Sequence, residues 1–293
     1  MKEAAVIQAH TSHVACVTFT ADSGTLLSAG MDNLIKLWSV PGWEPMDTFE
    51  GHEKSVNTLA LTPDESLLAS GSMDSTVKLW AYPSGHVIKT LNGHKKTVVG
   101  VAVAPDGRTL ASASYDGHVL LWDIHNGELL AALKGHEKNV GSLAFSPRGD
   151  ILASAGLGDD IFIWSVPSGV LLRRLGGHQV AVGSLAFSPD GELLVSSGGE
   201  GTVLFWSTSD WSVVRGIELN AGEGYPRAVA LAPDWKTMAV SLEHRVQRWS
   251  LDPAGLIEEA PVSAKGVYGL AFSPDGRWLA NAAADKKVRV WEQ

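Results

Sequence analysis

The sequence predicts an all-β fold made of seven repeated units, and the spacing of its tryptophans is the main reason. A fixed period between about 20 and 50 residues is typical of an array of repeated supersecondary units. Because the period spans the 293 residues, we expect a single domain, 1–293. Seven of the eleven tryptophans recur 42 residues apart, with a single step of 43: Trp38, Trp80, Trp122, Trp164, Trp206, Trp249 and Trp291.

The second unit, residues 52–92, shows what one repeat builds. Four short runs rich in apolar and β-branched residues follow one another, with turns containing Pro, Asp, Ser or Gly between them: VNTLALT, LLASGS, TVKLWAY and HVIKTL. Runs of this kind at intervals of about ten residues are typical of an antiparallel meander. No segment keeps a helical period long enough to compete. Each unit is therefore predicted to be a four-stranded antiparallel sheet.

One such sheet cannot bury both of its faces alone, so the units must pack against one another. Packing around a central axis gives a seven-bladed β-propeller, which leaves only short, protected edges. The chain ends just after the third strand of the last unit, and it begins with AAVIQAH, which aligns with KTLNGH in an inner unit. We therefore expect the N-terminal strand, residues 2–8, to complete the last blade and close the ring.

Composition narrows the class of protein. The formal charge of −9 and the pI of about 5.5 argue against a nucleic-acid surface, which needs clustered Lys and Arg. No apolar segment approaches the length that crosses a bilayer. The one cysteine, Cys16, cannot form an internal disulfide, and its alternating neighbours VACVTFT predict a buried side chain. We expect a soluble, cytoplasmic protein that is a monomer on its own, with no nucleic-acid or membrane partner.

Motifs at fixed places in the repeat resemble those of the WD-repeat β-propeller family over essentially the whole chain. A Gly-His pair opens units two to five, beginning with Gly51-His52. The Asp that gives the family half its name follows only Trp122, while Ser, Ala or Glu follows the other six repeat tryptophans. An acidic residue stands six positions before five of the tryptophans: Asp32, Asp74, Asp116, Glu200 and Asp285.

The resemblance implies a hydrogen-bonded set inside each blade, made by a loop His, a strand Ser or Thr, a turn Asp and the strand Trp. A buried imidazole, carboxylate and indole N–H each need a partner, and these groups can satisfy one another. Later units depart from the pattern, since Gly158 takes the acidic position of unit four, and Asn220 and Glu243 replace His and Asp in unit six. The complete sets are expected to be His10, Asp32 and Trp38; His52, Asp74 and Trp80, with Ser70 or Ser72; and His94, Asp116 and Trp122.

Neither a metal site, a cofactor nor an enzyme is indicated. Five of the ten histidines are the repeat histidines, one per blade, whereas zinc needs three or four ligands at one point. The Ser, His and Asp trio recurs with the repeat, and a single active site is not built that way. No phosphate-binding Gly-rich loop is present.

We expect a non-catalytic scaffold that binds a peptide or protein partner. In the family, three positions per blade face the top entrance of the channel, and such loops on a stiff frame are where recognition residues sit. The hypothesis is a peptide across the top, with an acidic group held by Arg227 and apolar side chains against Tyr115 and the methionines. The large or charged residues at these positions are Met31, Met73, Tyr115, Leu157, Tyr225, Arg227 and Tyr268.

Two alternatives stay open. Three further tryptophans fall in turns where other units carry Gly or another turn residue: Trp43, Trp211 and Trp235. These turns are all expected on the face opposite the top entrance of the channel, called the bottom face here. Trp211 and Trp235 are expected in neighbouring blades. They would suit a structural subunit that works inside a larger assembly. The other alternative is an enzyme with its pocket over the central channel, which would need a convergent polar set there.

Overall fold

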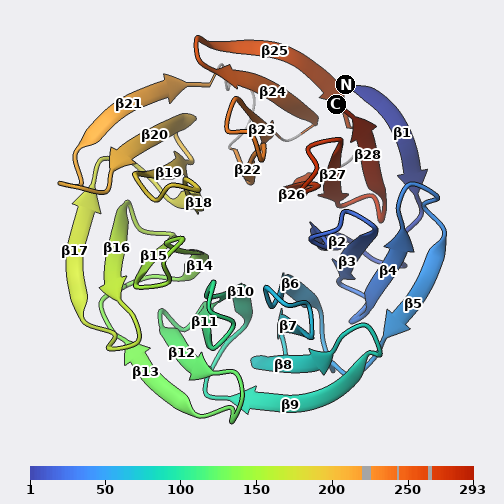
Figure 1. Cartoon of the computed structure of the whole chain (residues 1–293), viewed down its shortest axis with the longest axis horizontal. Coiled ribbons are helices and arrows are strands. Elements are labelled where there is room, and N and C mark those ends of the chain that lie inside the picture. The colour runs from blue at the N-terminus through green and yellow to red at the C-terminus, as the bar shows by residue number, and fades with distance from the viewer. Residues whose placement is uncertain (220–225, 243, 263–265) are drawn as a thin grey trace. The chain divides into compact units, whose positions relative to one another are not determined.

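The computed structural model describes residues 1–219, 226–242, 244–262 and 266–293. These residues contain 28 β-strands, β1 to β28, and no helix among them could cross a membrane. The strands form seven four-stranded antiparallel sheets, which we number as blades 1 to 7 (Figure 1). The predicted all-β, seven-bladed β-propeller fold is therefore confirmed.

In blades 1 to 6 the order of strands in the sheet is the order in the chain. Blade 1 contains β2 (Val14–Phe19), β3 (Thr25–Gly30), β4 (Ile35–Ser39) and β5 (Pro45–Phe49); blade 2 contains β6 (Val56–Leu61), β7 (Leu67–Ser72), β8 (Thr76–Ala81) and β9 (His86–Asn92); and blade 3 contains β10 (Val98–Val103), β11 (Thr109–Ser114), β12 (Val119–Asp123) and β13 (Leu129–Leu133). Blade 4 contains β14 (Val140–Phe145), β15 (Ile151–Gly156), β16 (Asp160–Ser165) and β17 (Leu171–Gly176); blade 5 contains β18 (Val182–Phe187), β19 (Leu193–Gly198), β20 (Thr202–Ser207) and β21 (Val213–Glu218); and blade 6 contains β22 (Val229–Leu231), β23 (Thr237–Ser241), β24 (Arg245–Leu251) and β25 (Ala254–Pro261).

Blade 7 joins the two ends of the chain in one sheet, as predicted. It contains β26 (Val267–Phe272), β27 (Trp278–Ala283) and β28 (Val288–Glu292), and β1 (Lys2–Ile7) supplies its outer strand. The register runs from Lys2 opposite Glu292 to Ile7 opposite Val288, with one irregularity between Glu3 and Ala5. The N-terminal amine also forms an ion pair with Glu258 on β25.

The chain divides into two compact units. Unit 1 consists of residues 1–59 and 221–293, and unit 2 of residues 60–220. Blades 1, 6 and 7 belong to unit 1, blades 3 to 5 belong to unit 2, and blade 2 falls mostly in unit 2. The expectation of one domain over 1–293 stays a prediction.

Within each unit the hydrophobic core lies between successive blades, and its position follows from the composition of the strands. The residues of the second strands are mostly small or apolar, and all six residues of β11 and of β27 are buried. Fourth strands are exposed except near their ends, where β13 buries only Leu133. Within unit 2, clusters of buried side chains join blades 2 and 3, 3 and 4, and 4 and 5. The repeat Trp belongs to these clusters, so within unit 2 each blade buries a face of its neighbour.

The glycine of the Gly-His motif permits this packing. A Cβ on Gly93 would lie 2.7 Å from the ring of Trp122, and one on Gly177 would lie 2.8 Å from the ring of Trp206. Atoms that close overlap, so a side chain at either position would push the indole away from the preceding blade. The glycine is thus required by the tryptophan.

Candidate functional site

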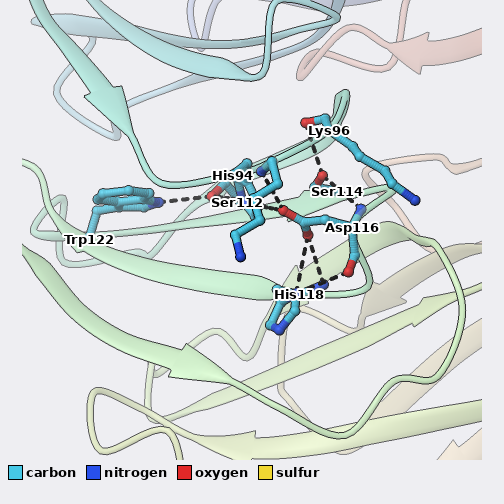
Figure 2. Close-up of polar contacts among 8 residues, drawn as sticks. His94, Lys96, Ser112, Ser114, Asp116, His118 and Trp122 are labelled. Carbon is cyan, nitrogen blue, oxygen red and sulfur yellow. Dashed lines mark hydrogen bonds and ion pairs between the residues drawn. The ribbon is translucent and has the colours of Figure 1, made fainter.

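Blade 3 shows the hydrogen-bonded set in complete form (Figure 2). The Nε1–H of Trp122 donates to Ser112 Oγ at 2.8 Å, and Ser112 Oγ lies 2.8 Å from His94 Nε2. His94 Nδ1 lies 3.0 Å from Asp116 Oδ2. Because a carboxylate only accepts, Nδ1 carries the proton, and the Ser hydroxyl donates to Nε2. Every polar atom of the chain from indole to carboxylate is then satisfied.

The charges of this set favour a structural role. Burial lowers the pKa of His94, although Asp116 acts in the opposite direction. Burial alone would raise the pKa of Asp116, but the N–H groups of Lys95 and His118 and the interaction with His94 outweigh burial and lower that pKa. At neutral pH the imidazole is neutral and the carboxylate is ionised. Neither group is poised to transfer a proton there.

Blades 1, 2 and 5 keep the arrangement with local changes. In blade 1, Ser28 Oγ links His10 and Trp38, each at 2.9 Å, and Asp32 lies 2.8 Å from His10 Nδ1. In blade 5 Glu200 takes the acidic place and lies 2.5 Å from His178 Nδ1. The predicted residues of blade 2 occupy the same positions: Trp80 donates to Ser70 at 2.8 Å, Asp74 accepts the N–H of Thr76 at 2.9 Å, and His52 is buried.

Blade 4 lacks the carboxylate. His136 Nε2 still lies 2.7 Å from Ser154 Oγ, which also accepts the Nε1–H of Trp164 at 2.8 Å. Gly158 occupies the acidic position, and the nearby Asp160 carboxylate is turned to Arg174 Nε, 2.5 Å away. Burial lowers the pKa of His136 to about 4.

Blades 6 and 7 replace the missing loop His with a residue that the sequence analysis did not identify. It stands two positions before the Trp, on the third strand. Gln247 is 2% exposed, and its Oε1 accepts the Nε1–H of Trp249 at 3.1 Å. Arg289 is 5% exposed, and it forms an ion pair with Asp285. The available signal was a long polar residue at this position in the two units that lack the His.

A recurring backbone bond positions the top loops, by which we mean the loops after the fourth strands and the turns between second and third strands. In blades 3 and 4, the N–H of Tyr115 donates to the carbonyl of Thr97 at 3.0 Å, and that of Leu157 to Asn139 at 2.9 Å. In blade 1, Met31 donates to His13 at 2.8 Å. The residue before the acidic position is thus fixed beside the third residue after the His position.

In unit 2, three of the predicted binding residues expose large side chains on these turns. Met73 is 51% exposed, Tyr115 44% and Leu157 56%. Their blades are successive in the chain, and β10 packs beside both β7 and β14. Rigidly held, solvent-facing apolar side chains of this kind are suited to contact a partner.

In unit 1, the top loops bring together an aromatic and cationic group. The guanidinium of Arg227 lies 5.4 Å from the centroid of the Tyr268 ring, a cation–π distance. The ring of His13 stacks on Tyr268 at 6.0 Å with an interplanar angle of 26°. Arg227 is exposed and forms no ion pair with any described residue, and Met31 is 39% exposed. The predicted residue Tyr225 lies outside the described residues.

The bottom-face tryptophans occupy turns with a left-handed backbone. Their φ values are 58° for Trp43, 64° for Trp211 and 57° for Trp235. The register predicted from the repeat places glycines at equivalent positions, and Gly85 and Gly127 have φ of 72° and 75°. All three tryptophans are half-buried.

Packing within each unit accounts for two of these side chains. Trp43 meets Trp278 edge-on, with ring centroids 5.1 Å apart. Trp211 packs against the cluster between blades 4 and 5. Trp211 and Trp235 belong to different units, so the expectation that they lie together stays a prediction.

Across residues 1–219, 226–242, 244–262 and 266–293, no group of three or more His, Cys, Asp or Glu could hold a metal ion. Cys16 is not paired, and burial raises its pKa to about 11.

Comparison with known families identifies the repeat. The profile of the family described as WD domain, G-beta repeat matches residues 1–39, 43–81, 85–123, 127–165, 169–207 and 260–292. The segment without a match carries most of blade 6, whose loop His and turn Asp are replaced. A comparison with curated proteins finds no match. Because the profile covers well over half of the chain, this protein belongs to the WD-repeat family.

Proposed function

We propose that this chain is a non-catalytic scaffold that binds a peptide or protein partner through its top loops. WD-repeat propellers are generally protein-interaction scaffolds, so membership of this family supports a role in binding proteins. Binding through the top loops is supported by the exposure of Tyr115 and Leu157 on turns fixed by backbone bonds, and by the exposure of Met73 on the equivalent turn of blade 2. Recognition residues on a rigid frame lose little entropy on binding.

The chemistry of the top loops supports one class of partner. Arg227 offers an exposed guanidinium backed by Tyr268, which suits an acidic group. Tyr, Met and Arg are the residue types enriched at protein interfaces. We therefore propose that the top loops of unit 1 take a carboxylate of the partner at Arg227. The exposed turns of unit 2 take apolar side chains of the partner.

The bottom-face alternative receives less support. Trp43 and Trp211 are half-buried on the cores of their own units, so less of each indole is available to a partner. Their packing suits a stabilising role. A cytoplasmic location and a monomeric state remain proposals, the first resting on one unpaired cysteine.

Affinity measurements with the isolated partner test the proposal. The partner is obtained by affinity purification from the native cell, and its affinity is measured by calorimetry. Tyr115→Ala and Arg227→Glu should each weaken binding by about tenfold or more, the loss typical of a central interface residue. Ile88→Ser is the matched control, because Ile88 is an exposed side chain on the outer strand β9 and lies outside the top loops. Losses of less than about twofold in both top-loop variants, with folding intact, would reject the proposal.

A further inference from the structure

In each complete blade the residue six positions before the Trp supplies one carboxylate, which is surrounded by hydrogen-bond donors. In blade 3, Asp116 lies within 3.0 Å of His94 Nδ1 and accepts the N–H of Lys95 at 2.8 Å. In blade 1, Asp32 does the same with His10 at 2.8 Å and with the N–H of Thr11 at 2.8 Å. The imidazole and the next backbone N–H therefore form a pair of donors directed at the same group.

Blade 4 keeps these donors and lacks the side chain that accepts from them. His136 is held by Ser154, as in the complete blades. Because Ser154 accepts from Trp164, its hydroxyl donates to Nε2 and leaves the imidazole proton on Nδ1. The described residues offer no hydrogen-bond acceptor to this Nδ1–H or to the N–H of Glu137. A Cβ built on Gly158 would meet no atom within 4 Å.

A small cavity occupies this place. Its volume is about 90 Å³, and its lining includes His136, Glu137, Gly158, Asp160, Phe162 and Arg174. Since a water molecule takes about 30 Å³ of liquid, the cavity has room for the few heavy atoms of a carboxylate group.

The charged residues near the cavity leave the donors free. The Asp160 carboxylate is engaged by Arg174, whose guanidinium also lies 5.4 Å from the centre of the Phe162 ring. The side chains of Glu137 and Asp159 are exposed, where water screens their charge. Arg174 and Lys138 add positive charge at the rim.

We propose that blade 4 binds a carboxylate from outside the chain, at the place that Asp116 occupies in blade 3. The ligand is either a small carboxylic acid or an Asp, Glu or C-terminal carboxylate of a peptide. The site shares no residue with the affinity tests above, and it does not rest on the proposed function. Burial keeps the pKa of His136 at about 4, so that its ring is a neutral donor under ordinary conditions, and a bound carboxylate would raise that pKa.

The experiment follows the His136 ring and the Glu137 amide by NMR at about pH 6, a pH at which acetate is ionised. Sodium acetate is titrated against sodium chloride at equal ionic strength. Acetate should shift both signals with saturation and raise the pKa of His136, and chloride should not. A capped Gly-Asp-Gly peptide is the second arm. Tighter binding of the peptide than of acetate assigns the site to a protein partner, and equal or weaker binding assigns it to a small acid.

Two variants serve as matched controls. Gly158→Asp supplies the carboxylate from within and should abolish the acetate response, while Gly158→Asn fills the space without raising the pKa of His136. Asp116→Gly opens the same place in blade 3 and should gain an acetate response at His94. The proposal is overturned if neither acetate nor the peptide gives a saturable shift in the wild-type protein, or if the shifts persist unchanged in Gly158→Asp.

Discussion

Single residues decide how well each blade satisfies its buried polar atoms. His94 and His136 lie in neighbouring blades and have equivalent Ser and Trp partners. They differ because His94 also faces a carboxylate, that of Asp116, and His136 does not. A buried histidine without an opposite charge resists protonation. The acid sensitivity of this protein should therefore concentrate in blade 4.

The pH dependence of stability tests this difference. His136 has a pKa of about 4 in the folded chain and near 6.5 when unfolded. The unfolded state takes up the proton first as pH falls, so stability is complete above about pH 6.5 and is lost toward pH 4. Between pH 7 and 5 this residue should cost about 2 kcal/mol. Gly158→Asp raises the pKa of His136 and should reduce the loss, measured by urea unfolding at both pH values. Gly158→Asn is the uncharged control, and equal losses in wild type and Gly158→Asp would contradict the account.

At the scale of strands and turns, a left-handed turn makes any residue other than glycine energetically costly. Trp43 adopts φ of 58°, which costs a residue with a Cβ roughly 1 kcal/mol and costs Gly little. Its contact with Trp278 offsets that cost. The indole of Trp43 thus covers Trp278 at the cost of a left-handed backbone.

Paired substitutions separate the backbone term from the packing term. Trp43→Ala and Trp43→Gly both lose the indole and should destabilise the protein, but Trp43→Gly should be more stable than Trp43→Ala by about 1 kcal/mol in urea unfolding. Met46 is an exposed residue inside β5, and there the Met46→Ala variant should be more stable than the Met46→Gly variant, as is usual in a strand. The same order at both positions would refute the strain argument.

The replacement of His in blade 6 makes a second prediction for an element. Gln247→Leu leaves the Trp249 N–H without its acceptor and should cost about 1–3 kcal/mol. Lys78 stands at the equivalent position of blade 2, where Trp80 donates to Ser70, so Lys78→Leu should change stability by less than about 0.5 kcal/mol. Chemical unfolding compares the two, and equal effects would show that Gln247 does not replace the histidine set.

At the scale of the whole chain, the tryptophan period predicted the seven blades and the place of β1, because each Trp must pack on a neighbouring blade. The roles of Gln247 and Arg289 could not be predicted in the same way. The equivalent residues of blades 1 and 2 are lysines that remain accessible, and a polar side chain turns inward only where the His is missing. The stacking of His13 and Arg227 on Tyr268 joins three blades, and sequence spacing does not give such a contact.

The strand that joins the chain ends should control cooperative folding. Deleting residues 1–7 exposes the edge of β28, including Val288 and Val290, which are fully buried in the intact sheet. An exposed apolar edge is a template for aggregation. Light scattering and thermal melting should show aggregation or a broadened transition, and adding a peptide of residues 1–9 should restore the intact behaviour. A truncated protein that melts and sediments like the full chain would show that β1 is dispensable.

Site-specific photo-crosslinking can detect a protein partner bound to the top loops. Benzoylphenylalanine is placed at Tyr115, at Met31 and, as a control, at Ile88 on the outer strand. The purified partner should crosslink from the two top-loop positions and not from Ile88, and Arg227→Glu should weaken the crosslink at Met31. Crosslinking from Ile88 alone, or equally from all three positions, would contradict binding through the top loops.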